Sequence, residues 1–340
     1  MNVLAIVDDP LFAEHRAPAG HPERPERLDA ARAGLAKAHL GLGVVTLDPR
    51  DATDEELGRA HGAGYLARLG QAAGASGYLD ADTYYCPASV DAARRAAGGA
   101  VGLVDALIDG QARFGLALVR PPGHHARPDG AMGFCLLNNV AIAAAHARAR
   151  GIDRVAVVDF DVHHGNGTQE TFFADPSVLF VSLHQFPFYP GTGAADEVGQ
   201  REGAGFTVNV PLSAGANDAV YAAAFDRLVA PIVEQYDPGL VLISAGFDAH
   251  QRDPLASMSL SDAAYGYMVS RVAQSMPRGA SGRMALVLEG GYDLRALSES
   301  LTSALGALED PAPLDGGELR PRHEQELARI LALQKAFWQL

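Results

Sequence analysis

Short runs of apolar residues alternate with alanine-rich segments along almost the whole chain, and this alternation most constrains the fold. Most of the apolar runs are continuous, which is typical of parallel strands that are covered on both faces. Strands that alternate with helices favour a mostly parallel sheet between helical layers. The sequence therefore predicts an α/β fold with eight strands, at residues 3–7, 44–47, 116–119, 155–159, 178–183, 206–210, 240–244 and 285–289.

No proline- or serine-rich linker, shift of composition or internal repeat divides the 340 residues, so we expect one domain over residues 1–340. From residue 308 the chain reads as a loop, followed by an amphipathic helix at 324–338 that should pack on the body of the domain. A role for this last helix in binding a partner is the alternative. The other predicted helices lie at residues 25–39, 88–109, 137–150, 218–236, 261–275 and 295–307, several with Asp, Asn or Ser near the start.

The formal net charge of −14 argues against binding a nucleic-acid backbone or an anionic membrane surface, because both need a field of positive potential. No apolar run approaches the roughly 18–20 residues of a membrane span. The first residues lack the basic region and cleavage site of a signal peptide. We therefore expect a cytoplasmic protein, and self-association into a homo-oligomer stays open.

Polar or glycine-rich segments directly follow five of the predicted strands. In an open parallel sheet, ligands bind at the carboxyl ends of the strands. A purely structural explanation would have to account for five such segments separately. They are RPPGHH, FDVHHGNGT, HQFPFYPGTG, AGFDAH and GGYDL.

One of these segments carries a candidate metal site. Asp161 and His163 are two residues apart, so an extended backbone would point both side chains to the same side. With Asp248 they give two carboxylates and one imidazole with an open fourth position, which is the arrangement of a catalytic zinc site. An isolated Asp-x-His is more often a capping Asp and a surface His, but its place at a strand end favours the metal. Fe(II) and Mn(II) also bind carboxylate-rich sites, so the metal itself stays open.

The adjacent His124 and His125 suit proton transfer near a metal, provided that a carboxylate or amide fixes each tautomer. Asp159 and Asn166 are the candidates for that task. A buried Asp159 would need a histidine or a monovalent cation as partner. Tyr292 follows two glycines, and its hydroxyl could donate to a developing oxyanion, although alone it would read as an ordinary rim tyrosine.

Six segments resemble the signature segments of the histone deacetylase and acetylpolyamine amidohydrolase family, which has an arginase-like fold. They are most similar to its class II branch, and the similarity runs from HPERPERL near residue 21 through Tyr292. The resemblance implies a zinc-dependent deacetylase with a three-layer αβα fold around an eight-stranded parallel sheet. The segments are RPPGHHA, GFCLLNN, VDFDVHHGNGTQ, SLHQFPFYPGTG, GFDAHQRDPL and LEGGYDL.

The resemblance also implies a role for each matching residue. His125 would be the general base and then the acid, with His124 as its electrostatic companion. Tyr292 would hydrogen-bond the substrate carbonyl and its oxyanion. Asp159 and Asn166 would orient the histidines, and the zinc ligands would be Asp161, His163 and Asp248.

Further positions match a substrate channel, structural potassium ions and a cavity through which acetate leaves. Arg27 matches the arginine of that cavity. Gly133, Phe134 and Tyr189 would line the channel, with Leu255 at its rim. The potassium positions are Asp159, Asp161, His163, Ser182 and Leu183 for one ion, and Phe172, Asp175, Val178 and Phe206 for a second.

Two departures from related patterns bear on the substrate and the metal. Polyamine-preferring relatives carry an acidic residue where Leu255 stands, so an apolar residue favours acetyl-lysine in peptides or proteins. Gly165 replaces the last carboxylate of the two-metal run in arginase-type enzymes, so one metal is expected. Small acetylated amines such as polyamines remain the alternative substrate. A non-catalytic acyl-lysine binding module is a third reading, which the intact Tyr292 and histidine pair oppose.

Overall fold

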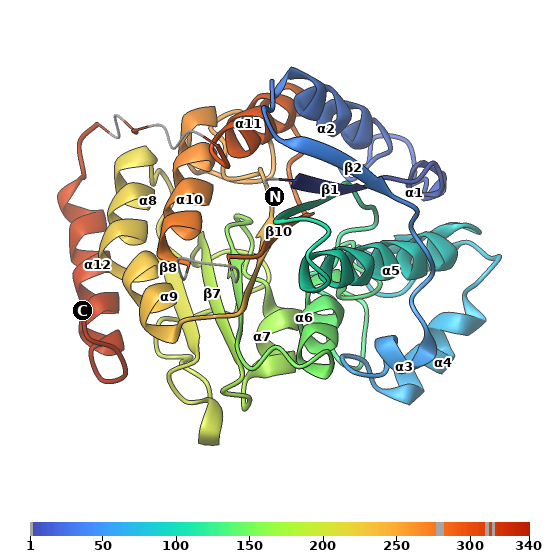
Figure 1. The fold of residues 1–340 in the computed structure, drawn as a ribbon, viewed down its shortest axis with the longest axis horizontal. Helices are drawn as coiled ribbons and strands as arrows, with labels where there is room; N and C mark the ends of the chain where they lie inside the picture. Colours follow the sequence, from blue (N-terminus) through green and yellow to red (C-terminus); the bar gives the residue numbers. More distant parts are fainter. Residues whose placement is uncertain (1–2, 277–281, 310–312, 315–316) are drawn as a thin grey trace.

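The computed structural model describes residues 3–276, 282–309, 313–314 and 317–340, and an eight-stranded sheet lies at its centre (Figure 1). All neighbouring strands are parallel, in the order β2-β1-β5-β10-β9-β6-β7-β8. The predicted parallel α/β sheet is therefore confirmed. The strands are β1 (Val3–Val7), β2 (Gly43–Leu47), β5 (Phe114–Ala117), β6 (Val155–Asp159), β7 (Val178–Gln185), β8 (Thr207–Leu212), β9 (Leu240–Ala245) and β10 (Met284–Leu288).

Helices cover both faces of this sheet and complete three layers (Figure 1). On one face, α5 (Ser89–Ile108) and α6 (Asn139–Ala149) pack against each other and against the central strands. On the other face, α2 (Glu26–Lys37), α11 (Leu294–Gly306) and α10 (Asp262–Ser275) form a row. The remaining helices are α1 (Leu11–Glu14), α3 (Asp54–Leu57), α4 (Ala63–Gln71), α7 (Asn166–Phe172), α8 (Asp218–Ala224), α9 (Ala230–Tyr236) and α12 (Pro321–Gln334), with a 3₁₀ turn at Arg201–Gly203 and a π turn at Phe225–Val229.

Burial along the strands follows their place in the sheet. Every residue of β5, β6, β7, β9 and β10 is buried, as expected for continuous apolar runs. The same expectation is wrong for β2, where Val44 is 53% and Val45 37% exposed. This strand is at the edge of the sheet, where one neighbouring strand is missing.

Several element boundaries differ from those expected. The strand expected at 116–119 begins two residues earlier, and the N–H of Leu118 makes one last bond to the Val7 carbonyl, 2.9 Å long, before the chain turns away. The helix expected at 218–236 contains a π turn in its middle. The sequence did not predict α1, α3, α7 or the hairpin of β3 (Gly77–Tyr78) and β4 (Tyr84–Tyr85), because each is too short to show a period. It also missed α4, whose nine residues do carry an amphipathic pattern.

The C-terminal helix α12 lies against β8 and α8 (Figure 1). It begins and ends a few residues before the range expected from sequence and buries Leu327 and Ile330. The indole N–H of Trp338 then donates to the Gly205 carbonyl at 3.0 Å. Residues 310–312 and 315–316 of the expected loop lie outside the described residues, and the extent of the domain stays a prediction.

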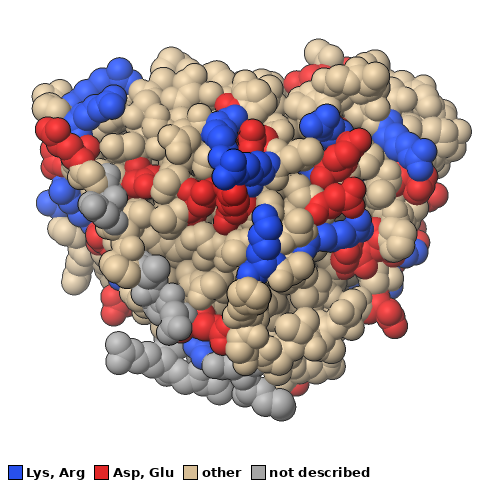
Figure 2. Space-filling model, turned by 90° about the horizontal axis from the view of Figure 1, so that it is seen from above, with Lys and Arg blue, Asp and Glu red and all other residues tan. Residues whose placement is uncertain are grey.

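Charges of both signs are interspersed on the face of the molecule seen in Figure 2, and the described part of that face carries no broad field of Lys and Arg. This distribution agrees with the formal net charge of −14. Among the described residues, no helix combines the length and apolar character that crossing a membrane would require.

Buried His61, which lies just before α4, connects this segment to the start of α6. Its Nδ1 donates to the Arg127 carbonyl at 2.9 Å, while its Nε2 accepts the Asn138 N–H at 2.9 Å. An imidazole that accepts through one nitrogen must be neutral. Burial accordingly lowers the pKa of His61 to about 4.

The protein should therefore lose stability in mild acid. The unfolded chain binds a proton at His61 near pH 6.5, whereas the folded chain does so only near pH 4, so stability falls as the pH drops through this window. We expect a loss of about 2 kcal/mol of unfolding free energy from this residue between pH 7.5 and 5. Urea unfolding at both pH values measures it. His61→Gln should be less stable at pH 7.5 but depend less on pH, and equal slopes for the two proteins would contradict the assignment.

Candidate active site

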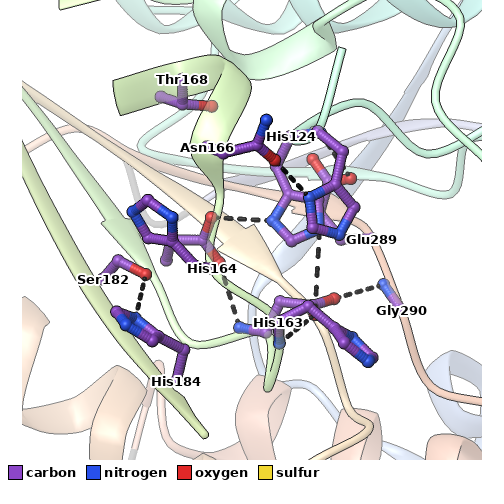
Figure 3. A network of polar contacts seen from close by, with 12 residues as sticks. His124, His163, His164, Asn166, Thr168, Ser182, His184, Glu289 and Gly290 are labelled. Carbon is purple, nitrogen blue, oxygen red and sulfur yellow. Dashed lines mark hydrogen bonds and ion pairs between the residues drawn. The ribbon is translucent and has the colours of Figure 1, made fainter. Parts of the chain in front are cut away.

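Polar segments that follow four neighbouring strands meet at one edge of the sheet. Because β5, β10, β9 and β6 are adjacent and parallel, their carboxyl ends lie side by side. The histidine pair follows β5, the Asp-x-His segment follows β6, and Asp248 and Tyr292 follow β9 and β10. Figure 3 shows His124, His163 and Glu289 gathered in this region. Chain segments more than a hundred residues apart thus contribute to one site.

Asp161, His163 and Asp248 direct their ligand atoms to one point. One donor atom from each lies within 4.8 Å of the others, and all three residues are buried. The Nδ1 atom of His163 is 3.2 Å from Asp161 Oδ1 and 3.1 Å from Asp248 Oδ2. Residues 161–163 form bends beyond β6, so the extended backbone expected there is not observed, although the donor atoms still converge.

The electrostatics of these three groups favour a bound cation. Burial and repulsion by Asp161 raise the pKa of Asp248 to about 7. Burial lowers the pKa of His163, but its hydrogen bonds to the two carboxylates outweigh this and raise the pKa to about 10. A divalent cation bound by the three groups would replace the proton on His163 that lies between the two carboxylates. Two carboxylates and one imidazole are donors that zinc accepts, so the residues fit such an ion.

The two histidines that follow β5 have different partners. His124 Nδ1 lies 2.9 Å from Asp159 Oδ2, a fully buried carboxylate at the last position of β6. His125 Nδ1 lies 2.8 Å from the side-chain oxygen of Asn166, the first residue of α7. The structure thus brings together the four residues that the sequence singled out, and it pairs the carboxylate with one histidine and the neutral amide with the other.

These partners move the two pKa values in opposite directions. Burial lowers the pKa of His124, but attraction by Asp159 and Asp161 outweighs burial and raises the pKa well above its ordinary value. Burial lowers the pKa of His125, and repulsion by His124 and His163 lowers it further. His124 is therefore cationic and His125 neutral near pH 7, and a neutral imidazole can accept a proton.

Tyr292 lies beside these groups, and a hydrogen bond of its main chain to Asp253 holds it there. Its N–H donates to Asp253 Oδ2 at 2.6 Å, and the other oxygen of that carboxylate accepts the Leu255 N–H at 3.0 Å. The Arg27 guanidinium lies over the ring, 5.0 Å from its centroid. Burial raises the pKa of Tyr292 well above its ordinary value, although Arg27 opposes this, so the hydroxyl keeps its proton and can donate a hydrogen bond.

A cavity of about 190 Å³ opens over these groups. Its wall includes Gly133, whose φ of +57° favours glycine and which has no room for a side chain, because a Cβ there would overlap the His125 ring. The Tyr189 ring stands perpendicular to that of His125, with centroids 5.3 Å apart. The four expected channel residues all line this cavity. The described residues that line it are Asp82, His125, Gly133, Phe134, His163, Phe188, Tyr189, Leu255 and Tyr292.

Two lining residues, Asp82 and Phe188, were not predicted from sequence. Asp82 belongs to the turn between β3 and β4, and burial and the nearby Asp80 raise its pKa. An acidic group therefore lies at the cavity, where sequence reasoning had placed only the apolar Leu255 at the rim. The short aspartate-rich turn at 80–82 has no strand period and follows no predicted strand, so no signal in the sequence singled it out.

Arg27 is fully buried, and each of its three guanidinium nitrogens donates a hydrogen bond. Its guanidinium pairs with Glu23 at 3.0 Å and donates to the carbonyls of Gly291, at 2.6 Å, and Glu289. Arg120, which begins the RPPGHH segment, pairs with the same glutamate through two bonds of 2.5 and 2.6 Å. These arginines tie together the loops that carry the histidines and Tyr292, and a role of Arg27 in acetate release stays a prediction.

The positions expected for potassium fall into two groups of neighbours. Asp159 and Ser182 are paired in register on β6 and β7, and the Ser182 hydroxyl lies 3.0 Å from His184 Nδ1 (Figure 3). For the second ion, the Asp175 N–H donates to the Phe172 carbonyl at 3.0 Å, and Val178 begins β7 beside them. Phe206 precedes β8, and its carbonyl accepts the N–H of Phe180 on β7. A role in holding potassium stays a prediction for both groups.

Comparisons with known proteins agree with this geometry. The sequence model of the histone deacetylase domain matches residues 21–308. The chain is 42% identical over 94% of its length to "Histone deacetylase 15" of Arabidopsis thaliana, and 44% identical over 88% of its length to "Polyamine deacetylase HDAC10" of Homo sapiens. It spans only 59% and 46% of those two proteins.

A solved structure described as the HDA15 HD domain superposes with a TM-score of 0.91 at 40% identity. The match covers 99% of this chain and 95% of the other. The matched region contains the histidine pair, the three candidate metal ligands and Tyr292. The chain belongs to the histone deacetylase family.

Proposed function

We propose that the protein is a zinc-dependent deacetylase that hydrolyses the amide of acetyl-lysine side chains. One observation carries the proposal: the buried Asp161–His163–Asp248 cluster, the neutral His125 and the protonated Tyr292 all adjoin a single cavity of about 190 Å³. A metal site, a proton acceptor and a hydrogen-bond donor around one space are the parts that amide hydrolysis requires. Zinc would be held by the three clustered residues, and there it would polarise the carbonyl and lower the pKa of a water molecule.

The residues of the chain would divide the remaining work. His125, kept neutral by burial and by the charge of His124, takes a proton from the attacking water and later gives it to the leaving amine. Tyr292 donates a hydrogen bond to the oxyanion that forms from the carbonyl. Asn166 holds His125 in one tautomer, and Asp159 keeps His124 protonated. Phe134 and Tyr189 would enclose the aliphatic chain of the substrate and exclude water.

Tyr292→Phe tests the catalytic part of this proposal. Because the hydroxyl would stabilise charge that exists only in the transition state, kcat for an acetyl-lysine peptide should fall about 100- to 1,000-fold. The zinc content should not change. Tyr267→Phe, which removes a hydroxyl bonded to Asp226 at 2.7 Å, is the matched control and should keep full activity. Undiminished turnover in the Tyr292 variant would exclude the assigned role, and a wild-type protein that binds acetyl-lysine without turnover would instead be a binding module.

Small acetylated amines are the alternative substrates, and two observations support keeping them. One relative is named a polyamine deacetylase, and Asp82 adds an acidic group at the cavity that could attract a second ammonium group. The apolar Leu255 favours acetyl-lysine in peptides instead. A kinetic panel of acetylated peptides and acetylpolyamines, with the zinc loaded and then removed, decides between these classes.

Leu255→Glu should shift the preference between them. A carboxylate at this partly buried position would pair with the second ammonium of an acetylpolyamine, and one such pair is worth about 1 kcal/mol. We expect kcat/KM for the acetylpolyamine to rise about fivefold relative to the peptide. Leu255→Gln has the same shape without the charge and should not change the ratio. An equal shift in both variants would contradict the electrostatic explanation.

The proposal extends to the setting of the enzyme. The chain would act as one catalytic domain over residues 1–340, with α12 packed on its body, structural potassium ions beside the zinc and a location in the cytoplasm. The packing of α12 on β8 and α8 supports the first of these.

A further inference from the structure

Glu289 is a buried carboxylate beside the histidine pair to which the mechanism above gives no role. It follows β10 directly and is fully buried. Its Oε2 atom accepts the main-chain N–H of Gly123 at 2.6 Å and that of His124 at 3.2 Å. Figure 3 shows its side chain next to His124. A side chain from one strand end therefore holds the main chain that leaves another.

The other oxygen of this carboxylate, Oε1, lowers the stability of the folded protein. Glu289 Oε1 is buried and has no hydrogen-bond partner among the described residues. A buried carboxylate that is only partly hydrogen-bonded is unfavourable for folding. The two main-chain bonds are its only hydrogen bonds within the described residues, and a gain in stability does not explain a buried carboxyl group with one unpaired oxygen. Such a local conflict is expected where a residue serves the function of a site.

The main chain at Glu289 is itself held rigidly. Its carbonyl accepts from the Arg27 guanidinium, which also bonds to the Gly291 carbonyl at 2.6 Å. The next N–H, of Gly290, donates to Asp161 Oδ2 at 2.8 Å. No side chain fits at Gly290, because a Cβ would overlap the carboxylates of Asp161 and Asp248. The segment that carries Glu289 is thus fixed against the candidate metal ligands.

The main chain at Gly123 is enclosed from the opposite side. A Cβ on Gly123 would overlap the main-chain nitrogen of Asn139 in α6. The Asn139 side chain also donates to the Pro121 carbonyl at 3.1 Å. The loop therefore lies between the start of α6 and the Glu289 carboxylate, and loss of the carboxylate would open one side of this enclosure.

We propose that Glu289 is a positioning residue, whose carboxylate holds the main chain of Gly123 and His124 and so sets the place of both imidazoles relative to the metal ligands. The inference rests on the proposed deacetylase function for its kinetic consequence, but the positioning itself does not. Without the acceptor, two buried N–H groups lose their partner and the loop shifts to find another. A displacement of about 1 Å at a catalytic group can cost about 100-fold in rate.

Two variants separate the hydrogen-bond acceptor from its charge. Glu289→Leu removes the acceptor, and kcat should fall about 10- to 100-fold while KM changes less than about threefold, because the substrate contacts lie elsewhere. Glu289→Gln keeps an oxygen that can accept both N–H groups, so it should restore kcat to within about threefold of wild type. Zinc content is measured in each variant. Glu56→Leu removes another buried carboxylate, paired with Arg50 far from the cavity, and should lower Tm without changing kcat.

Hydrogen exchange at the amides of Gly123 and His124 gives a readout that does not depend on turnover. It should be faster in Glu289→Leu than in wild type and close to wild type in Glu289→Gln. Unchanged exchange and kcat in the leucine variant would overturn the inference, as would a glutamine variant as slow as the leucine variant, which would assign the effect to charge. If the wild-type protein deacetylates nothing, the proposed function fails while hydrogen exchange still decides the role of Glu289.

Discussion

Asp248→Asn is expected to reduce turnover to the rate of the metal-free protein, a fall of at least about a thousandfold, because without the metal the pKa of the attacking water would no longer be lowered. The substitution preserves volume but removes one of the two carboxylates that surround His163. Asp248 also accepts the Val162 N–H at 2.8 Å, and an asparagine oxygen can keep that bond. The loss should therefore come from the metal and not from the loop.

Metal analysis and kinetics together check this result. Zinc content should drop in the variant, and chelation of the wild-type protein should reproduce its low rate, with recovery when zinc is restored. Asp218→Asn is the matched control, because Asp218 accepts two bonds from Ser261 and does not line the cavity. A wild-type protein that stays active after complete chelation would contradict the metal-dependent mechanism.

His125→Ala is expected to lower kcat about 100- to 10,000-fold, because it removes the group that moves the proton. His124→Ala should be milder near neutral pH, since His124 is cationic and does not accept the proton. The two variants should also differ in their pH profiles. The positive charge of His124 lowers the pKa of His125, so removal of His124 should raise the pKa of His125. The Asp159 carboxylate would also lose its cationic partner, and its negative charge would raise the pKa of His125 further.

The acid limb of the pH profile of kcat/KM measures this change in the pKa of His125 directly. In the wild type it should lie below pH 6.5, since the pKa of His125 is lowered, and in His124→Ala it should move to higher pH. His21→Ala, at a histidine that packs on Phe134 at 4.7 Å between ring centroids, separates a general loss of an imidazole from loss at the pair. Equal damage by His124→Ala and His125→Ala at every pH would show that the division of roles is wrong.

Much of the architecture was readable from local patterns. Burial on both faces of a strand produces a continuous apolar run, and a helix between two strands forces them parallel, so the eight strands and the flanking helices could be predicted. The exception, β2, has the same apolar pattern but stands at the edge, and nothing local distinguishes an edge strand from a central one. Helix α7 and the β3–β4 hairpin were not predicted, because they are too short to show a period.

The sequence by itself determined which chemical groups follow the strands, since Asp161 and His163 are neighbours along the chain and His124 and His125 are adjacent. Only the tertiary structure decided how they pair. From the sequence, Asp159 could pair with either histidine. In the structure, β6 packs beside β9 and α7 lies over the loop that carries the histidines, so that Asp159 is 2.9 Å from His124 and Asn166 is 2.8 Å from His125. Asp82 at the cavity and Glu289 at the Gly123 main chain were decided in the same way. Hydrogen bonds form only near 3 Å, and the order of strands that are distant in sequence sets such distances.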